Sequence, residues 1–181
     1  MKVKDLMMAS PCYCQPETNL GTATELMWNA NCGFLPVQSA EGKLIGVLTD
    51  RDICIALGTR NRPAGEIAVA EVMSEKPYSC APDDDVHVAL HTMGGAKVHR
   101  LPVIAQNGTL VGVLSMDDIL FRAEPSGLGK KPELSNDEVV SILRSIVQQS
   151  VADGMARRVT QSGDNKNYPK KELSVNQHLV A

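Results

Sequence analysis

The chain has 181 residues, a length that fits one domain or two small ones. Of these residues 43% are hydrophobic and 22% are charged, which is close to the average for globular proteins. Its net charge of −3 gives no sign of a nucleic-acid-binding surface, and no apolar run approaches the roughly 20 residues that span a bilayer. We therefore expect neither a nucleic-acid partner nor a membrane association.

The N-terminal stretch MKVKDLMM has basic residues but no apolar segment behind them, so we do not expect a secretory signal. The expected compartment is the reducing cytoplasm, where the five cysteines, an odd number, would be free thiols. Three Tyr, two Phe and one Trp are few, so the core should be aliphatic and rich in methionine.

An internal repeat organises most of the chain. Residues 7–54 align with residues 73–120 at a constant shift of 66 without a gap, and 17 of the 48 aligned positions are identical. The identities include two Leu-Pro-Val triplets and two Gly-Val-Leu triplets. This agreement indicates a duplicated unit.

In chain order, the first repeat starts with an extended piece that ends at residues 14–16. A helix begins at Thr18 or Asn19, because such residues cap helix starts and the apolar positions that follow recur at spacings of three and four. The strand FLPVQ, a turn with Gly42, the strand KLIGVL and a helix from Thr49 complete the unit.

The second repeat has the same order. A helix follows the acidic run at residues 83–85, then come the strand RLPVI, an Asn107–Gly108 turn, the strand TLVGVL and a helix from Ser115. We expect an α/β (α+β) fold of two β-α-β-β-α units, related by a pseudo-twofold axis, with their sheets packed face to face.

The domain boundaries follow from the repeat and from composition. We expect the first repeat at 1–60, a Gly- and Pro-containing linker at 61–69, and the second repeat at 70–123. Residues 124–153 should be a loop and a helix that begins near Ser135, where a capping-box pattern stands. Residues 154–181 have little periodicity and are expected to be a disordered tail.

Both repeats carry the pattern Gly-apolar-apolar-Ser/Thr-x-x-Asp where a strand meets a helix. One interpretation is an ordinary N-cap with an acid three positions on. The functional interpretation is a nucleoside phosphate site: helix-start N–H groups and the hydroxyl would hold phosphate, and the aspartate would accept from ribose hydroxyls. The glycines, Gly46 and Gly112, would let another chain or a flat ligand approach the strand closely.

The repeat resembles the cystathionine-β-synthase (CBS) domain, and the tandem resembles a Bateman module. The resemblance rests on residues 4–7 and 70–73, the two LPV triplets, and the GVLTDRD and GVLSMDD junctions, and it covers residues 1–123. It implies disc-shaped homodimers. It also implies that AMP, ADP or ATP, with S-adenosylmethionine or NAD as further possibilities, binds in clefts between the repeats.

The resemblance assigns Thr49 with Asp52 to one cleft and Ser115 with Asp118 to the other, with the hydroxyls on phosphate and the aspartates on ribose. The main chain on both sides of each proline would face the adenine, which adds Phe34, Leu35, Pro36, Arg100, Leu101 and Pro102 to the candidates.

The two repeats differ in charge at aligned positions. Arg51 is replaced by Asp117 in the second repeat, and the basic Lys97, His99 and Arg100 have neutral counterparts in the first. These basic side chains are candidates for phosphate contacts. For Arg51, an ion pair within the chain or across a dimer is an equal alternative.

Other constellations are weaker. Cys12 with Cys14, and His87 with His91, have spacings seen in metal sites but lack a full ligand set. We see no nucleophile with a paired base and no catalytic or phosphate-loop motif, so we expect neither an enzyme nor a required cofactor.

The sequence therefore predicts a regulatory module that senses adenine nucleotides, forms a homodimer and signals to an unknown protein partner. A ligand-free dimerisation module is the alternative, and a metal or redox sensor is a third.

Overall fold

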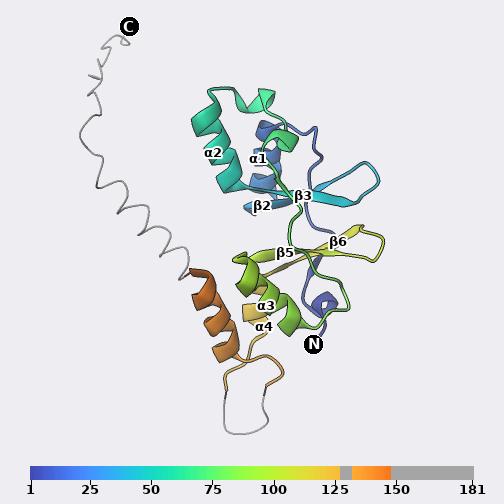
Figure 1. Cartoon of the computed structure of the whole chain (residues 1–181), viewed down its shortest axis with the longest axis vertical. Coiled ribbons are helices and arrows are strands. Elements are labelled where there is room, and N and C mark those ends of the chain that lie inside the picture. The colour runs from blue at the N-terminus through green and yellow to red at the C-terminus, as the bar shows by residue number, and fades with distance from the viewer. Residues whose placement is uncertain (127–131, 148–181) are drawn as a thin grey trace, which may run out of the picture. The chain divides into compact units, whose positions relative to one another are not determined.

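Two three-stranded antiparallel sheets lie at the centre of the fold in the computed structural model (Figure 1). The structure describes residues 1–126 and 132–147, and residues Met1–Ile146 form one unit. This α/β architecture confirms the expected fold class. The tail expected at 154–181 lies outside the described residues, as does the end of the expected C-terminal helix.

The first repeat contains α1 (Leu20–Asn29), β2 (Phe34–Gln38), β3 (Leu44–Thr49) and α2 (Asp50–Arg60). The second repeat contains α3 (Val86–Ala96), β5 (Arg100–Ile104), β6 (Leu110–Ser115) and α4 (Met116–Arg122). Short elements complete the list: η1 (Val3–Asp5), β1 (Met8–Ala9), η2 (Ala64–Glu66), η3 (Val69–Glu71) and β4 (Ser74–Glu75).

The repeats exchange their leading segments. β1, at the start of the first repeat, pairs with β6 of the second, and β4, at the start of the second, pairs with β3 of the first. The stretch expected as a linker at 61–69 is also structural, because Ile67 and Val69 are fully buried in the first core. The two spatial units therefore do not coincide with the two sequence repeats.

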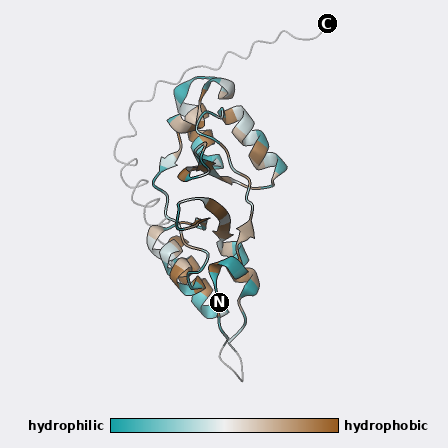
Figure 2. Cartoon of the chain, turned by 90° about the vertical axis from the view of Figure 1, so that its right-hand side faces the viewer, coloured by the Kyte–Doolittle hydropathy of each residue, from teal (hydrophilic) through white to brown (hydrophobic). Residues whose placement is uncertain are grey.

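Each sheet and its helices enclose a separate aliphatic core, and Figure 2 shows hydrophobic residues along the central strands. Fully buried members of the first core include Leu20, Leu35, Leu48 and Ile67, and those of the second include Leu90, Met93, Leu101, Leu114 and Ile119. Cys14 and Cys80 occupy equivalent buried positions in the two cores, as predicted for small apolar residues.

The hairpin turns of the two repeats hydrogen-bond to each other. Leu44 N–H donates to the Gly108 carbonyl at 3.2 Å, and Leu110 N–H donates to the Gly42 carbonyl at 3.2 Å. Both glycines have positive φ, 76° and 84°, which favours glycine. This reciprocal pair is the local signature of the pseudo-twofold relation.

Side chains cap the helices that follow the extended pieces. Asn19 rather than Thr18 caps α1, since its Oδ1 accepts from Thr22 N–H at 2.9 Å. Asp85 caps α3, accepting from His87 N–H at 2.9 Å.

A further helix occupies residues 136–147, and its start is held by Glu138 N–H donating to Ser135 Oγ at 3.3 Å. Leu134, Val139 and Ile146 are buried with the second core. No helix among the described residues has the length and apolar character to cross a membrane.

Candidate functional site: two unequal clefts between the repeats

A larger cleft of about 580 Å³ opens where β3 and α2 of the first repeat meet the loop before β5 of the second. Its lining comes from both repeats and includes Thr49, Asp50, Arg51, Asp52, Glu75, Lys76, Tyr78, Lys97, His99, Arg100 and Pro102, with Phe34.

A smaller cleft of about 280 Å³ lies where β6 and α4 meet the loop before β2. It is lined by Pro11, Cys12, Asn31, Cys32, Phe34, Pro36, Arg100, Val113, Ser115, Asp117 and Asp118, among others.

The clefts are related by the repeat. The shift of 66 carries Thr49 and Asp52 of the larger cleft onto Ser115 and Asp118 of the smaller one, and it carries Pro36 onto Pro102. The motif aspartates and hydroxyls therefore lie in two separate clefts, each built from both repeats.

The first strand-to-helix corner is a closed capping box. Thr49 Oγ1 donates to Asp52 Oδ2 at 2.7 Å and accepts from Asp52 N–H at 3.2 Å, while Thr49 N–H donates to the same Oδ2 at 2.9 Å. Asp52 Oδ1 has no donor among the residues that the structure describes. One carboxylate oxygen thus serves the helix, and the other takes no part in the cap.

The second corner repeats this geometry. Ser115 Oγ donates to Asp118 Oδ2 at 2.6 Å and accepts from Asp118 N–H at 3.1 Å, and Ser115 N–H donates to Oδ2 at 2.8 Å. The capping interpretation and the ligand interpretation are therefore compatible, because they use different atoms of the same aspartate.

The helix starts offer fewer free N–H groups than the motif suggested. In α2, Asp50 N–H donates to the Gly33 carbonyl at 3.2 Å and Arg51 N–H donates to Asp50 Oδ1 at 2.7 Å. In α4, Met116 N–H donates to the His99 carbonyl at 2.8 Å. Since these donors are already engaged, the basic side chains are the stronger anchors for a phosphate.

The two clefts differ in the charge of the side chains that line them. The larger one is lined by four cationic side chains, Arg51, Lys76, Lys97 and Arg100, against the three carboxylates Asp50, Asp52 and Glu75. The smaller one has only Arg100 as a cation, beside Asp117 and Asp118. The basic residues singled out in the sequence thus converge on one cleft, and Arg100 reaches both.

Four expected site residues lie elsewhere. Leu35 and Leu101, whose main chain was expected to face the adenine, are fully buried and line neither cleft. A Cβ at Gly46 would lie 2.8 Å from Met73 Sδ, and one at Gly112 would lie 2.6 Å from Met7 Sδ. The room beside these glycines is therefore taken by methionines of the exchanged segments and not by a ligand.

Sequence reasoning missed the contribution of the segments after β1 and β4. Lys76 and Tyr78 line the larger cleft, and Pro11 and Cys12 line the smaller one. The aligned Pro11 and Pro77 were visible in the repeat, but their cleft position follows from the strand exchange.

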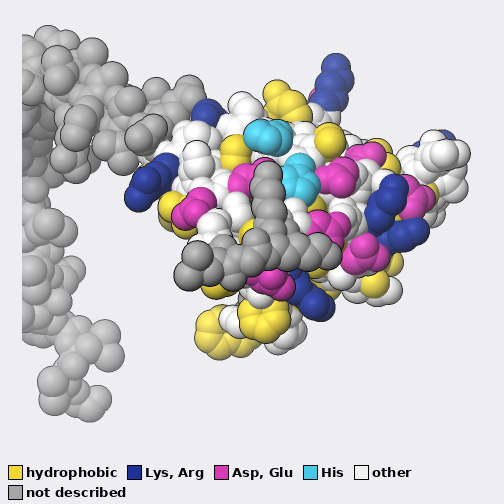
Figure 3. All heavy atoms as spheres, turned by 90° about the horizontal axis from the view of Figure 1, so that it is seen from below, with side chains coloured by type: hydrophobic (Ala, Val, Ile, Leu, Met, Phe, Trp, Pro, Cys, Tyr) yellow, Lys and Arg dark blue, Asp and Glu magenta, His cyan; other side chains and the backbone are white. Residues whose placement is uncertain are grey.

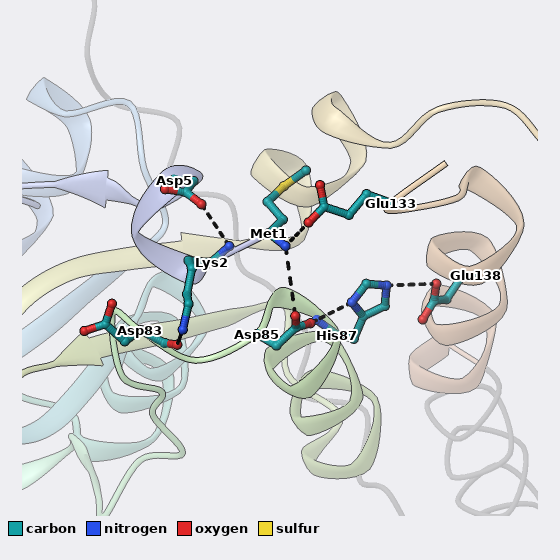
Figure 4. A network of polar contacts seen from close by, with 8 residues as sticks. All are labelled: Met1, Lys2, Asp5, Asp83, Asp85, His87, Glu133 and Glu138. Carbon is teal, nitrogen blue, oxygen red and sulfur yellow. Dashed lines mark hydrogen bonds and ion pairs between the residues drawn. The ribbon is translucent and has the colours of Figure 1, made fainter. Parts of the chain in front are cut away.

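The candidate metal residues have separate surroundings. Cys14 is buried, and burial raises the pKa of its thiol to about 12. His87 on α3 lies between Asp85 and Glu138 and contacts both (Figure 4). Within residues 1–126 and 132–147, no three His, Cys, Asp or Glu side chains are grouped to hold a metal ion.

Comparison with known proteins agrees with this architecture. A family model described as "CBS domain" matches residues 3–59 and 69–124, so the chain belongs to the CBS domain family and carries a tandem pair. The CBS domain-containing protein YhcV of Bacillus subtilis is 32% identical over 149 residues, which cover 82% of this chain and 97% of YhcV.

Two solved structures share the fold. The CBS domain pair of protein MJ0100, solved in complex with 5′-methylthioadenosine and S-adenosyl-L-methionine, has a TM-score of 0.60 at 24% identity, covering 66% of this chain and 92% of that one. CBSX2 from Arabidopsis thaliana, solved in complex with AMP, has a TM-score of 0.58 at 24% identity, covering 65% and 91%.

Proposed function

We propose that this chain is a regulatory module whose larger cleft binds an adenine nucleotide. The observation that carries the proposal is the larger cleft itself, in which Asp52 and four cationic side chains from both repeats line one space of about 580 Å³. A carboxylate that can accept from sugar hydroxyls, beside cations that can pair with phosphate, matches a nucleoside phosphate.

In the proposed complex, Asp52 Oδ1 accepts from the ribose hydroxyls while Oδ2 keeps its role in the helix cap. Arg51, Lys97 and Arg100 hold the phosphates, and Phe34 and Pro102 flank the base. Arginine suits this role because its planar guanidinium can bind a phosphate through two hydrogen bonds.

The smaller cleft, in this proposal, takes a nucleoside with little or no negative charge. Ser115 and Asp118 would contact its sugar, and Pro36 would flank its base. Asp117 stands where the larger cleft has Arg51, and it would repel a phosphate chain. The proteins MJ0100 and CBSX2 support the ligand class, since their structures hold adenosine compounds.

A signalling role follows from the way the clefts are built. Each is lined by both repeats, so a ligand that binds there links them and stabilises the folded module by mass action. We propose that a cytoplasmic homodimer passes this change to a protein partner, through the differential affinity of the ligand for two dimer arrangements.

Calorimetric titration of the full chain with ATP, ADP, AMP, adenosine, NAD and S-adenosylmethionine tests the proposal. We expect at least one nucleotide to bind and to raise the unfolding temperature, with nucleotides that carry more phosphate favoured at low salt. If none of the six gives heat or a thermal shift, nucleotide sensing is excluded.

A ligand-free interaction module is the second candidate, and its contacts would use exposed apolar side chains such as Trp28, Phe121 and Ile55, with exposed fractions of 84%, 88% and 53%. It predicts that Asp52→Ala and Asp118→Ala leave the oligomeric state unchanged, and that no adenosine compound alters it. Sedimentation of both variants, with and without ATP, separates the two functions.

A further inference from the structure

Lys97 is part of the larger cleft and also contacts the helix at residues 136–147. Its main chain ends α3 in the left-handed conformation (φ 58°), and the residue is one of those that line the larger cleft. Its ammonium, Nζ, also donates a hydrogen bond to the main-chain carbonyl of Ser145 at 3.0 Å. A single cation therefore connects the candidate nucleotide site to residues 136–147.

The helix at 136–147 lies along α3 through contacts at three places. Near its start, His87 Nε2 is 3.5 Å from Glu138 Oε2, beside the Asp85 cap of α3 (Figure 4). In its middle, a Cβ on Gly94 would lie 3.0 Å from Ile142 Cγ2, so the glycine allows close approach. Toward its end, the described polar contact with α3 is Lys97 with Ser145.

The start of this helix is embedded in a charged surface. Figure 3 shows His side chains beside a group of Asp and Glu side chains on this end of the molecule. The N-terminal ammonium of Met1 adds an ion pair with Glu133, just before the helix. Together with the buried Leu134 and Val139, these contacts fix the start of the helix independently of Lys97.

We propose that Lys97 couples the larger cleft to the helix: an anionic ligand draws the Lys97 ammonium away from Ser145 and loosens residues 142–147. This inference rests on the proposed function of the cleft. The neutral carbonyl of Ser145 is the weaker partner, because a phosphate oxygen carries a negative charge and adds a Coulomb attraction to the hydrogen bond with the ammonium. The ligand therefore wins the competition for the ammonium.

The other contacts that hold the helix in place limit how far the ligand can loosen residues 142–147. Ile146 remains buried at 2% exposure, so the ligand loosens residues 142–147 without detaching them from the second core. Coupling between two equilibria is reciprocal. If the ligand weakens the Lys97–Ser145 contact by some factor, then loss of that contact raises the affinity of the cleft for the ligand by the same factor. We expect a factor of about two to five, as for one exposed hydrogen bond.

Lys76 provides a matched control. It lines the same cleft and also has a left-handed main chain (φ 54°), so a Lys→Met change costs the backbone the same at both positions. It makes no hydrogen bond to residues 136–147 in the described structure. Both Lys97→Met and Lys76→Met remove a cation from the cleft, but only the first removes the link.

Hydrogen exchange of the amides of residues 142–147 in the full chain, with saturating ATP, adenosine or no addition, tests the coupling. In the wild type we expect ATP to speed exchange about two- to fivefold and adenosine to leave it unchanged. In Lys97→Met, exchange is fast already and ATP adds no further increase. In Lys76→Met, the wild-type response persists once ATP is raised to saturation.

Two failures are distinguishable by titration calorimetry on the same samples. If ATP binds but exchange of residues 142–147 stays constant or slows, the coupling is wrong while the nucleotide site stands. If ATP does not bind, both the nucleotide site and the competition at Lys97 are wrong. If Lys76→Met also abolishes the response, cleft charge in general and not the Lys97 contact carries the signal, which overturns the proposal.

Discussion

The Thr49 hydroxyl donates to Oδ2 of Asp52 at 2.7 Å, and this one oxygen also accepts from the Thr49 N–H at 2.9 Å. Ser115 and Asp118 hold the same relation at 2.6 and 2.8 Å. The carboxylate thus stabilises the helix start with one oxygen, and its second oxygen makes no hydrogen bond within the described residues. A substitution that preserves the shape of the cap but removes the charge separates the cap from the proposed contact with ribose.

Asp52→Asn is such a substitution. An asparagine can still accept from Thr49 N–H through its carbonyl oxygen, so we expect the thermal stability of the free protein to change little. A hydrogen bond from ribose to a charged acceptor contributes about 1.5–3 kcal/mol, so the affinity of the larger cleft for ATP should fall about ten- to a hundredfold. Titration calorimetry measures this change.

Asp118→Asn is the matched control, because it makes the same change in the smaller cleft. It should leave binding in the larger cleft within about twofold of the wild type. Equal loss of affinity in both variants would mean that the clefts bind as one site, contrary to the separate linings described above.

The repeat predicted the two sheets and their helices because its hydrophobic periodicity and helix caps are local signals. The exchange of β1 and β4 was not predictable in this way, since two-residue strands such as Ser74–Glu75 carry no information about which copy they pair with. The positions of Lys76 and Cys12 in the clefts depend on this exchange, so they were missed for the same reason.

Strand alternation could have removed part of the error. In β2, Leu35 and Val37 are fully buried in the core, while Pro36 between them lines the smaller cleft. The period of two was readable in the LPV triplet and places the side chains of Leu35 and Leu101 in the core, so only their main chain was ever a candidate for ligand contact. The sequence could not show that the N–H groups at the start of α2 are occupied, because the Gly33 carbonyl that accepts from Asp50 N–H lies in the loop before β2.

The charge difference between the clefts predicts a selectivity that one residue can shift. Arg51→Gln should reduce the affinity of the larger cleft for ATP about three- to tenfold and leave adenosine unaffected, because only the phosphate chain pairs with the guanidinium. Since Arg51 is exposed, the difference should shrink as salt rises. Calorimetric titrations at two salt concentrations check both statements.

Asp117→Asn is the complementary change at the aligned position of the smaller cleft. It removes a negative charge and should improve binding of phosphate-bearing ligands there, without an effect on adenosine. If Arg51→Gln weakens adenosine as much as ATP, the guanidinium acts on the base or on the protein, and its assignment to phosphate is wrong.

The buried cysteines predict a pattern of thiol reactivity. Burial raises the pKa of Cys14 and Cys80 to about 12, whereas Cys54 is exposed on α2. Since the thiolate is the reactive form, a water-soluble maleimide at pH 8 should label Cys54 in the native protein and reach Cys14 and Cys80 only after unfolding. Mass spectrometry of the labelled peptides measures this order.

The same shifts predict how stability depends on alkaline pH. The folded state keeps the two thiols protonated up to about pH 12, while the unfolded chain releases their protons near the ordinary thiol pKa of 9.0. Above that value the unfolded state binds fewer protons, so these thiols favour unfolding progressively between about pH 9 and 12. Replacing both by alanine should make denaturant stability less dependent on pH in this window.

Two adjacent glycines in α3 test the contact between α3 and the helix at 136–147. Gly95 is exposed with no atom within 4 Å of an added Cβ, whereas a Cβ on Gly94 would lie 3.0 Å from Ile142 Cγ2. Alanine improves the helix at either position by about 0.5–1 kcal/mol, so Gly95→Ala should stabilise the protein by that amount.

At Gly94 the same gain in helix propensity is opposed by the crowding of Ile142. Overpacking typically costs about 1–3 kcal/mol, so Gly94→Ala should be about 1–2 kcal/mol less stable than Gly95→Ala in urea unfolding. The gain in helix propensity is common to both variants, so the difference in stability between them measures the contact with Ile142.

A double variant, Gly94→Ala with Ile142→Val, should recover part of the loss, because the shorter side chain lacks the Cδ1 that lies 3.4 Å from the added Cβ. Equal stability of the two alanine variants would show that the helix does not pack on α3 at this point in solution.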